Sequence, residues 1–126
     1  MATVTLTKEN FEETLKSSST LLIDFWAEWC GPCRMFGPVF EEASEKHPEL
    51  TFAKVDTESQ PELAGSFGVR SIPTLAVFRD QIMVFREAGA LPAPALEELV
   101  EKVQELDMDH VRAELAKEEK EEAQPA

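Results

Sequence analysis

The sequence predicts an α/β fold in which a central, mixed five-stranded sheet is flanked by four helices and followed by an acidic C-terminal extension. Short apolar runs, rich in Val, Ile, Leu and Phe, alternate along the chain with longer segments that have the apolar spacing of helices. Two of these runs, 74–78 and 82–85, follow each other too closely for a crossover helix, so they must pair antiparallel. The length of 126 residues fits one compact domain with little left over.

The beginning of the chain predicts an edge strand, a helix and a central strand. Residues 4–6 alternate briefly, as a short edge strand does, and Thr7 can cap a helix that follows it. The run 21–26 is apolar on both faces, which is expected of a parallel strand that helices cover on both sides. Asp24 is the exception within this run.

A second helix is expected to begin at the cysteines and to run to about His47, where Pro48 stops it. Pro38 lies inside this helix, removes one backbone hydrogen bond and should bend it. The next strand spans 51–56, and a short helix with Pro61 in its first turn follows.

The hairpin of 74–78 and 82–85 turns at Asp80-Gln81, and the type of this turn stays open because Asn-Gly pairs are usual there. A last helix begins at Pro92 or Pro94. Its buried face consists of apolar residues at helical spacing: Leu96, Leu99, Val100 and Val103.

The composition changes beyond Gln104, where eight acids stand against three bases. We therefore expect a domain over 1–104 and an acidic, partly helical extension over 105–126. Asp109 could cap a short helix there, whereas 117–126 carry too much charge to bury a face and are expected to fray.

The net charge of −13 argues against nucleic acid and anionic membranes as ligands, because both would repel this chain. No run approaches the roughly 20 apolar residues that a bilayer crossing needs. The first ten residues lack the basic head and apolar centre of a secretion signal. We expect a cytoplasmic protein, and the high charge favours a monomer.

Cys30 and Cys33 are the only cysteines, and just Gly31 and Pro32 separate them. A bridge between them closes so small a loop that it would add little stability, which favours a reactive pair over a structural one. The alternative is half of a zinc site. Zinc needs four ligands, and only His47 and His110 could add nitrogen, neither at the spacing of a zinc finger.

At the start of a helix, Cys30 should be the attacking thiol, because unpaired N–H groups and the helix dipole lower the pKa of such a thiol. Cys33, one turn further on and expected to be more buried, would resolve the mixed disulfide and leave a Cys30–Cys33 disulfide. Gly31 and Pro32 would tune the redox balance, since they alter how the helix terminus holds the thiolate.

Two interpretations of Asp24 stay open from the residues alone. A carboxyl group in an apolar sheet should have a raised pKa, which suits a base that deprotonates Cys33 through a water molecule, with Lys54 on a neighbouring strand as its partner. Alternatively, Asp24 is a structural, hydrogen-bonded residue and Lys54 lies on the surface.

The chain resembles the thioredoxin family over about 4–103. The residues that carry this resemblance are the segments 24–33, with its Trp-Cys-Gly-Pro-Cys motif, 72–74 and 89–91. The resemblance implies the thioredoxin fold, a cis peptide bond before Pro73, and the base role for Asp24. It further implies an apolar docking rim around Cys30, formed by Trp29, Ile72, Pro73, Gly89 and Ala90, with the Ile72 backbone pairing with an extended substrate segment.

The function that the resemblance implies is that of a protein-disulfide reductase acting on disulfide-containing proteins. Such a protein binds no cofactor; its redox-active disulfide is reduced again by thioredoxin reductase, which draws on NADPH. A thioredoxin-fold chaperone without redox turnover and an oxidase or isomerase of an oxidising compartment are the alternatives. The entry Pro92-Ala93-Pro94 into the last helix departs from the family pattern, and the extension inherits no function from it.

Overall fold

The protein is described by a computed structural model that covers residues 2–123. Strands and helices alternate until a closing hairpin and two final helices. In chain order the elements are β1 (Thr3–Thr5), α1 (Phe11–Ser17), β2 (Thr20–Trp26), α2 (Gly31–Lys46), β3 (Thr51–Asp56), α3 (Pro61–Ser66), β4 (Thr74–Arg79), β5 (Ile82–Ala88), α4 (Ala93–Glu105) and α5 (Met108–Ala123).

The five strands form one mixed sheet, as predicted, and within it they lie in the order β1-β3-β2-β4-β5. β3 pairs in parallel with both β1 and β2, whereas β4 is antiparallel to β2 and β5 is antiparallel to β4. β2 therefore lies in the middle of the sheet with a paired strand on each side, which is why its apolar run is continuous.

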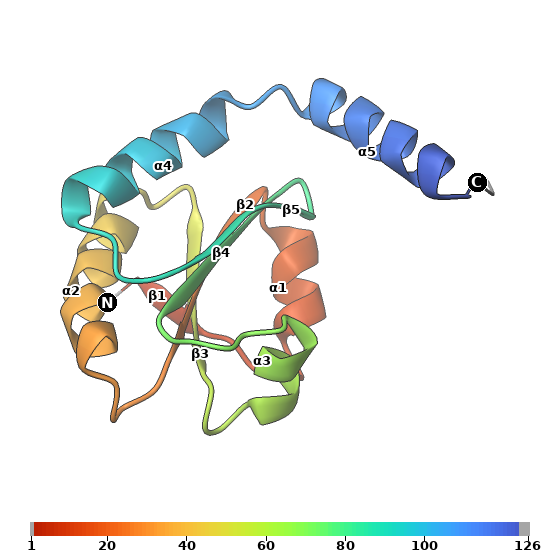
Figure 1. The fold of residues 1–126 in the computed structure, drawn as a ribbon. Coiled ribbons are helices and arrows are strands. Elements are labelled where there is room, and N and C mark those ends of the chain that lie inside the picture. Colours follow the sequence, from red (N-terminus) through yellow and green to blue (C-terminus); the bar gives the residue numbers. More distant parts are fainter. Residues whose placement is uncertain (1, 124–126) are drawn as a thin grey trace.

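Four helices cover the two faces of the sheet (Figure 1), with α2 and α4 on one face and α1 and α3 on the other. The alternation along β2 explains how both faces are filled, because successive side chains point to opposite sides of a strand. Leu21, Ile23 and Phe25 are buried beneath α1 and α3. Leu22 points toward α2 and α4, and Asp24 lies two residues further along that same face.

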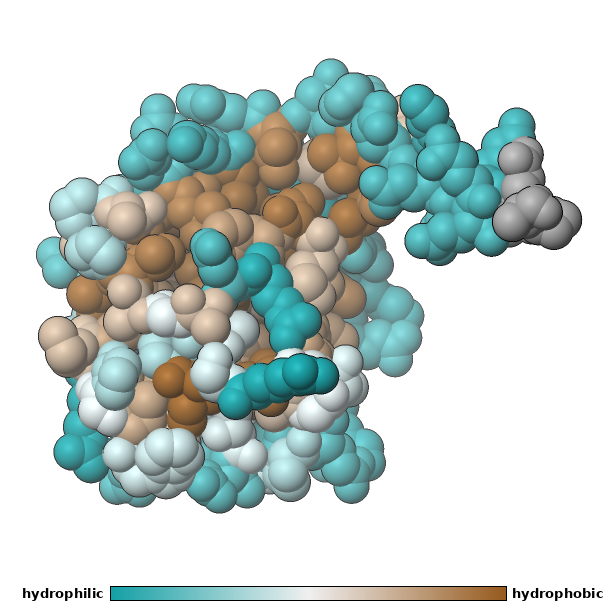
Figure 2. All heavy atoms as spheres, viewed as in Figure 1, coloured by the Kyte–Doolittle hydropathy of each residue, from teal (hydrophilic) through white to brown (hydrophobic). Residues whose placement is uncertain are grey.

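The fifth helix, α5, leaves the body of the domain at the end of the molecule opposite the start of α2 (Figure 1). Only its first turn is anchored: Met108 is buried, and Arg112 forms an ion pair with Asp80 in the β4–β5 turn at 3.3 Å. Figure 2 shows the rest of α5 as almost uniformly hydrophilic on the visible side. A helix with so little apolar surface is held by its first turn alone.

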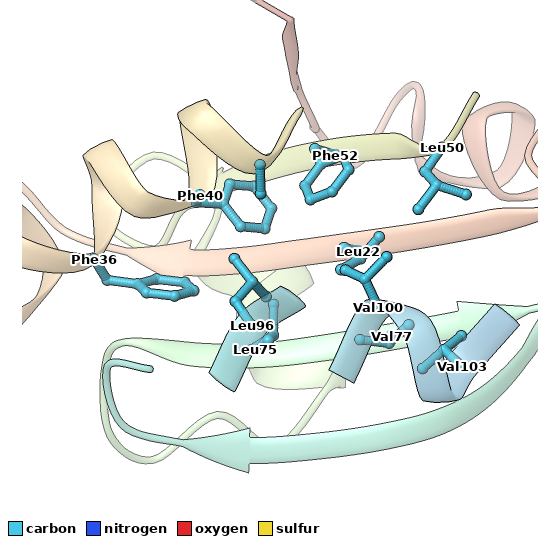
Figure 3. Close-up of a cluster of buried hydrophobic side chains, with 11 residues drawn as sticks. Leu22, Phe36, Phe40, Leu50, Phe52, Leu75, Val77, Leu96, Val100 and Val103 are labelled. Carbon is cyan, nitrogen blue, oxygen red and sulfur yellow. The ribbon is translucent and has the colours of Figure 1, made fainter. Parts of the chain in front are cut away.

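The core on the α2 and α4 face is formed by aromatic and aliphatic side chains that point toward one another from two helices and three strands (Figure 3). The ring of Phe40 of α2 lies between two others: it is 5.7 Å from the ring of Phe36 of α2, and 5.2 Å from the ring of Phe52 of β3 with the planes at 68°. Leu96 and other apolar residues of α4 close this layer. The packing fixes α2, and with it the start of α2, against the sheet.

The turn between β4 and β5 is now defined. Asp80 and Gln81 have φ of 51° and 67°, and Arg79 pairs with Ile82, so this is a two-residue turn of type I′. Arg79 Nη1 donates to the carbonyl oxygens of Val103 (2.7 Å), Gln104 (3.1 Å) and Leu106 (3.1 Å), which satisfies the C-terminal end of α4.

Two predicted helix starts are wrong. α1 begins at Phe11 with Asn10 as its N-cap. The Thr7 N–H donates to Asn10 Oδ1 at 2.7 Å and the Asn10 N–H donates to Thr7 Oγ1 at 3.3 Å, so Thr7 belongs to a turn that precedes the helix. α5 is capped by Asp107, whose Oδ1 accepts from the Asp109 N–H at 3.1 Å; Asp109 itself binds Arg112.

The prediction that residues 117–126 fray is also wrong over 117–123, which continue α5, while 124–126 lie outside the described residues. The described side chains of this part of α5 are all exposed, so the continuation of the helix does not depend on a buried face. Within residues 2–123, no helix is both long enough and apolar enough to cross a bilayer.

Candidate active site

The two cysteines lie at the point where the chain leaves β2 and enters α2. The backbone at Cys30 is extended, with φ −86° and ψ 115°, and Cys30 forms the N-cap of α2. Gly31 begins the helix and Pro32 stands in its first turn, where a missing N–H costs no helical hydrogen bond. The sulfurs of Cys30 and Cys33 form a disulfide, with the Cα atoms 5.2 Å apart.

Cys30 Sγ receives the stabilisation that a helix start offers. The backbone N–H of Cys33 donates to this sulfur across 3.2 Å. The sulfur also lies at the N-terminus of a 16-residue helix, where the helix dipole places partial positive charge. Both effects favour the thiolate form of Cys30 over that of Cys33 when the disulfide is reduced. The tuning role expected of Gly31 and Pro32 stays a prediction.

Residue burial does not distinguish the two cysteines, contrary to the expectation that Cys33 is more buried. Each cysteine is 4% exposed in the disulfide form. Their neighbours differ instead. Cys30 Sγ lies 3.6 Å from the carbonyl oxygen of Ile72, whereas Cys33 lines a cavity together with Lys54.

The segment 72–73 and the end of β5 are held together beside Cys30. The Ile72–Pro73 peptide bond is cis, as the resemblance implied. The carbonyl oxygen of Pro73 accepts a hydrogen bond of 2.8 Å from the N–H of Gly89, which has φ of 114°, a value that favours glycine. Ile72 packs against the buried cysteines. Ala90 is exposed, and Gly89 reaches the site through Pro73 rather than through Cys30.

Trp29 is a large exposed apolar side chain directly before Cys30, and it is 67% exposed. Its indole Nε1 donates to Glu58 Oε1 at 2.6 Å, which fixes the ring from the loop after β3. A hollow of about 320 Å³ lies beside Trp29 and Ile72. Sequence reasoning missed Glu58, because nothing in the spacing of an exposed loop acid connects it with a tryptophan on another loop.

Asp24 is a fully buried carboxyl group in the middle of the sheet, with 0% exposure. Neither of its oxygens has a hydrogen-bond partner among the described residues. Burial raises the pKa of Asp24 to about 7, and the positive charge of Lys54 opposes this rise. The structural interpretation, in which Asp24 is hydrogen-bonded, thus loses its main support.

Lys54 pairs with Asp24 in the parallel register of β2 and β3, so both side chains lie on the face that α2 covers. Lys54 Nζ is 5.0 Å from the centre of the Trp26 ring. A cavity of about 420 Å³ brings Lys54, Trp26 and Glu41 together with Cys33. Gly37 of α2 borders the ammonium group: a Cβ there would lie 3.8 Å from Nζ, an ordinary van der Waals contact.

The two histidines lie on other parts of the molecule than the dithiol. His47 Nε2 is 2.9 Å from Glu97 Oε1 and links the end of α2 to α4. His110 lies in the first turn of α5, where its N–H donates to Asp107 Oδ1 at 3.2 Å. Over residues 2–123 there is no group of three or more His, Cys, Asp or Glu side chains that could hold a metal ion.

A Cys-x-x-Cys disulfide at a helix N-terminus, beside a cis-proline segment, is the arrangement of a protein-disulfide oxidoreductase. Comparison with known proteins agrees. The family model described as Thioredoxin matches residues 2–104. The chain belongs to the thioredoxin family.

Individual relatives extend this likeness. The chain is 56% identical over 115 residues to "Putative thioredoxin 2" of Streptomyces coelicolor, which covers 91% of this chain and 86% of that protein. It is 44% identical over 97 residues to "Thioredoxin" of Alicyclobacillus acidocaldarius, covering 76% and 92% of the two chains. A solved structure of a mutant thioredoxin from Halobacterium salinarum NRC-1 matches with a TM-score of 0.76 and 34% identity, covering 82% of this chain and 91% of that one.

Proposed function

We propose that this oxidoreductase works as a reductase of protein disulfides, with Cys30 as the attacking and Cys33 as the resolving thiol. The observation that carries the proposal is the position of Cys30 Sγ, which receives the Cys33 N–H at 3.2 Å and lies 3.6 Å from the Ile72 carbonyl. One sulfur is thus both favoured as a thiolate and placed next to a backbone with which an extended substrate segment can pair.

The reaction proceeds by two exchanges of thiol and disulfide. The Cys30 thiolate attacks one sulfur of the substrate disulfide, which forms a mixed disulfide and releases the other substrate sulfur as a thiolate. The Cys33 thiolate then attacks Cys30 Sγ, so that the Cys30–Cys33 disulfide forms and the second substrate thiolate leaves. Two electrons pass from the dithiol to the substrate, whose thiolates take up protons.

The second exchange needs Cys33 to lose its proton, and Asp24 is the base that we assign to this step. Its pKa of about 7 means that a good part of Asp24 is ionised near neutral pH and can accept a proton there. Lys54 lines the cavity beside Cys33 and lies in register with Asp24, which supports its role as the partner of this base. A water molecule would carry the proton between Cys33 and the carboxylate.

Trp29, Ile72, Pro73, Gly89 and Ala90 form the docking rim in this proposal, and Gly31 with Pro32 tunes the redox balance. Membership of the thioredoxin family supports thioredoxin reductase as the partner that reduces the Cys30–Cys33 disulfide again, with electrons from NADPH. No prosthetic group is needed in this chain. We expect the protein to act as a monomer in the cytoplasm, where reductases of this kind work.

Substitution of Cys30 tests the proposal. In a turbidity assay of protein-disulfide reduction, Cys30→Ser should lower turnover by at least about a thousandfold, because the nucleophile is lost. Cys33→Ser is the matched control: it should still attack but stop at the mixed disulfide, which mass spectrometry detects. Unchanged turnover in Cys30→Ser would contradict the reductase proposal and favour a binding module.

The reduction potential provides a second measurement. A value well above that of the cytosolic glutathione pool would mean that the pair oxidises or rearranges disulfides instead of reducing them.

A further inference from the structure

A hollow of about 560 Å³ lies next to the docking rim, between the segment 68–74 and β5. Its lining includes two cations, Arg70 and Arg86, and one acid, Glu87. Figure 2 shows strongly hydrophilic side chains gathered on this near face, over the connection from α3 to β4 and over β5, against a paler surround. This local excess of positive charge is unusual in a chain with 25 acids and 12 bases.

Both arginines have donors to spare. Arg86 Nη2 donates to the carbonyl oxygen of Gly68 at 2.6 Å, which fixes the guanidinium over the hollow. Its Nη1 and Nε have no partner among the described residues, and Arg70 is exposed and forms no ion pair with any of residues 2–123. A guanidinium held at one corner still presents a fork of N–H groups that matches a carboxylate.

The hollow shares two lining residues with the apolar hollow beside Trp29 and Ile72, where the proposed function places a substrate. Arg70 and Ser71 line it on one side and line the apolar hollow beside Trp29 and Ile72 on the other. An extended chain that pairs with the Ile72 backbone therefore runs along this shared wall. Because side chains of an extended segment alternate at about 3.3 Å per residue, some enter the apolar hollow while others reach the arginines.

We propose that Arg70 and Arg86 form a carboxylate-binding subsite, which selects disulfide proteins that carry Asp or Glu close to the attacked cysteine. The inference rests on the proposed function, because that function brings an extended segment to Ile72. The subsite offsets the repulsion that a chain of net charge −13 exerts on an acidic partner, and it does so only at this edge of the docking rim.

The test uses binding without redox chemistry. The oxidised, full-length protein is titrated with two nine-residue peptides that lack cysteine and carry either four Glu or four Gln, while backbone amide signals are followed by NMR at 0.1 M salt. The Glu peptide should bind about fivefold more tightly than the Gln peptide, as expected for two exposed charge pairs, and should shift the signals of 68–74 and 86–88. The preference should shrink at 0.5 M salt.

Three variants locate the effect. Arg86→Glu should abolish or reverse the preference for the Glu peptide, and Arg70→Glu should do the same without touching the Arg86–Gly68 contact. Lys102→Glu makes the same change of net charge on the exposed side of α4, where Lys102 pairs with Glu98, and should keep the preference. Equal binding of the two peptides to the unaltered protein, or loss of the preference in Lys102→Glu as well, would overturn the subsite.

A kinetic arm separates this inference from the proposed function. The same sequences with an added disulfide are offered as substrates, and kcat/KM for the Glu form relative to the Gln form should fall about fivefold in Arg86→Glu. If neither peptide is reduced while the binding preference holds, the reductase proposal fails and the subsite stands. If both are reduced with equal kcat/KM by all variants, the subsite fails and the reductase stands.

Discussion

The two cysteines of the disulfide are equally buried but face different parts of the molecule. Cys30 Sγ lies against the carbonyl of Ile72, beside the exposed ring of Trp29. Cys33 lines a cavity that holds an ammonium group, and the buried carboxyl of Asp24 lies on the same face of the sheet. The surroundings of Cys30 offer contacts to another protein, whereas the surroundings of Cys33 offer groups that take or hold a proton.

In the mechanism that we propose, this difference separates the two halves of the reaction in space. The fixed backbone N–H groups at the start of α2 stabilise the thiolate of Cys30, so the first attack would need no base. Cys33 provides its N–H to that sulfur and lies a turn deeper along the helix, so its own thiolate must come from elsewhere. Changes on the two sides should therefore affect different steps.

Among changes that keep both cysteines, the largest effect is expected on the proton side, from Asp24→Asn. The resolving step should slow by about a hundredfold, which is typical for loss of a general base, while the first attack changes little. Rapid-mixing kinetics that follow formation and decay of the mixed disulfide measure both steps. Equal slowing of the two would break the separation between the two sides.

The same variant has a consequence for stability. The folded protein holds the Asp24 proton up to a pKa of about 7, whereas the unfolded chain releases it near 3.8, so unfolding releases a proton between these values. The contribution of the Asp24 carboxyl to the free energy of unfolding is therefore fully present below the lower pKa. It is lost as pH rises through the upper pKa, and the loss amounts to about 4 kcal/mol. The unfolding free energies of Asp24→Asn and of the unaltered protein are measured in denaturant at pH 4 and at pH 8. The difference between them should shift in favour of Asp24→Asn by this amount from pH 4 to pH 8. A difference that stays constant would contradict the raised pKa.

A smaller effect is expected from Lys54→Met, which removes the charge and keeps the length of the side chain near Trp26. The charge of Lys54 lowers the pKa of Asp24, so its removal should raise the pKa of Asp24 further. The pH midpoint of the resolving step should therefore move upward. Lys46→Met, at the far end of α2, is the control and should leave the midpoint in place. A downward move would show that Lys54 does not act on Asp24.

On the docking side, Glu58→Gln should have a modest effect. The Trp29 Nε1 donor would lose a charged acceptor at 2.6 Å, and the ring would be held less firmly. We expect KM for a protein substrate to rise about threefold with kcat unchanged, since an exposed hydrogen bond of this kind contributes about 1 kcal/mol or less. A change in kcat alone would mean that Glu58 acts on the chemistry instead.

The smallest effect on turnover is expected from deletion of 107–126, which touches neither side of the disulfide. The buried Met108 and the Arg112–Asp80 pair would be lost, so thermal unfolding should show a cost of about 2 kcal/mol. Steady-state reductase assays should remain near the value for the full chain. A large loss of turnover would assign the extension a part in catalysis.

Much of this could be predicted from the sequence because the signals are local. The apolar run 21–26, the interruption at Asp24 and the Cys-x-x-Cys motif each lie within a few residues, and each structural consequence follows from strand or helix geometry. The raised pKa of Asp24 also follows from its position in a buried strand.

The features that the sequence did not predict depend on contacts between distant segments or on competition between neighbouring residues for the same hydrogen bonds. Thr7 is a good helix cap in isolation, but Asn10 binds back to it and takes its place. The pairing of Glu58 with Trp29 and the Arg86–Gly68 contact join loops that have no common periodicity. The two cysteines are buried together with Ala27, and Trp26 and Ile72 pack against this cluster; spacing along the chain does not show such a packing.

The β4–β5 turn acts as a clamp for both final helices: Arg79 binds the last carbonyls of α4, and Asp80 holds the first turn of α5 through Arg112. It lies at the Thr20 end of β2, and the dithiol follows the Trp26 end. The 16 residues of α5 thus form a helix about 24 Å long, which starts at the end of the domain opposite the dithiol. A fluorophore, affinity handle or second domain fused behind this helix would stand clear of incoming substrates, which makes that terminus the natural attachment point for an engineered version.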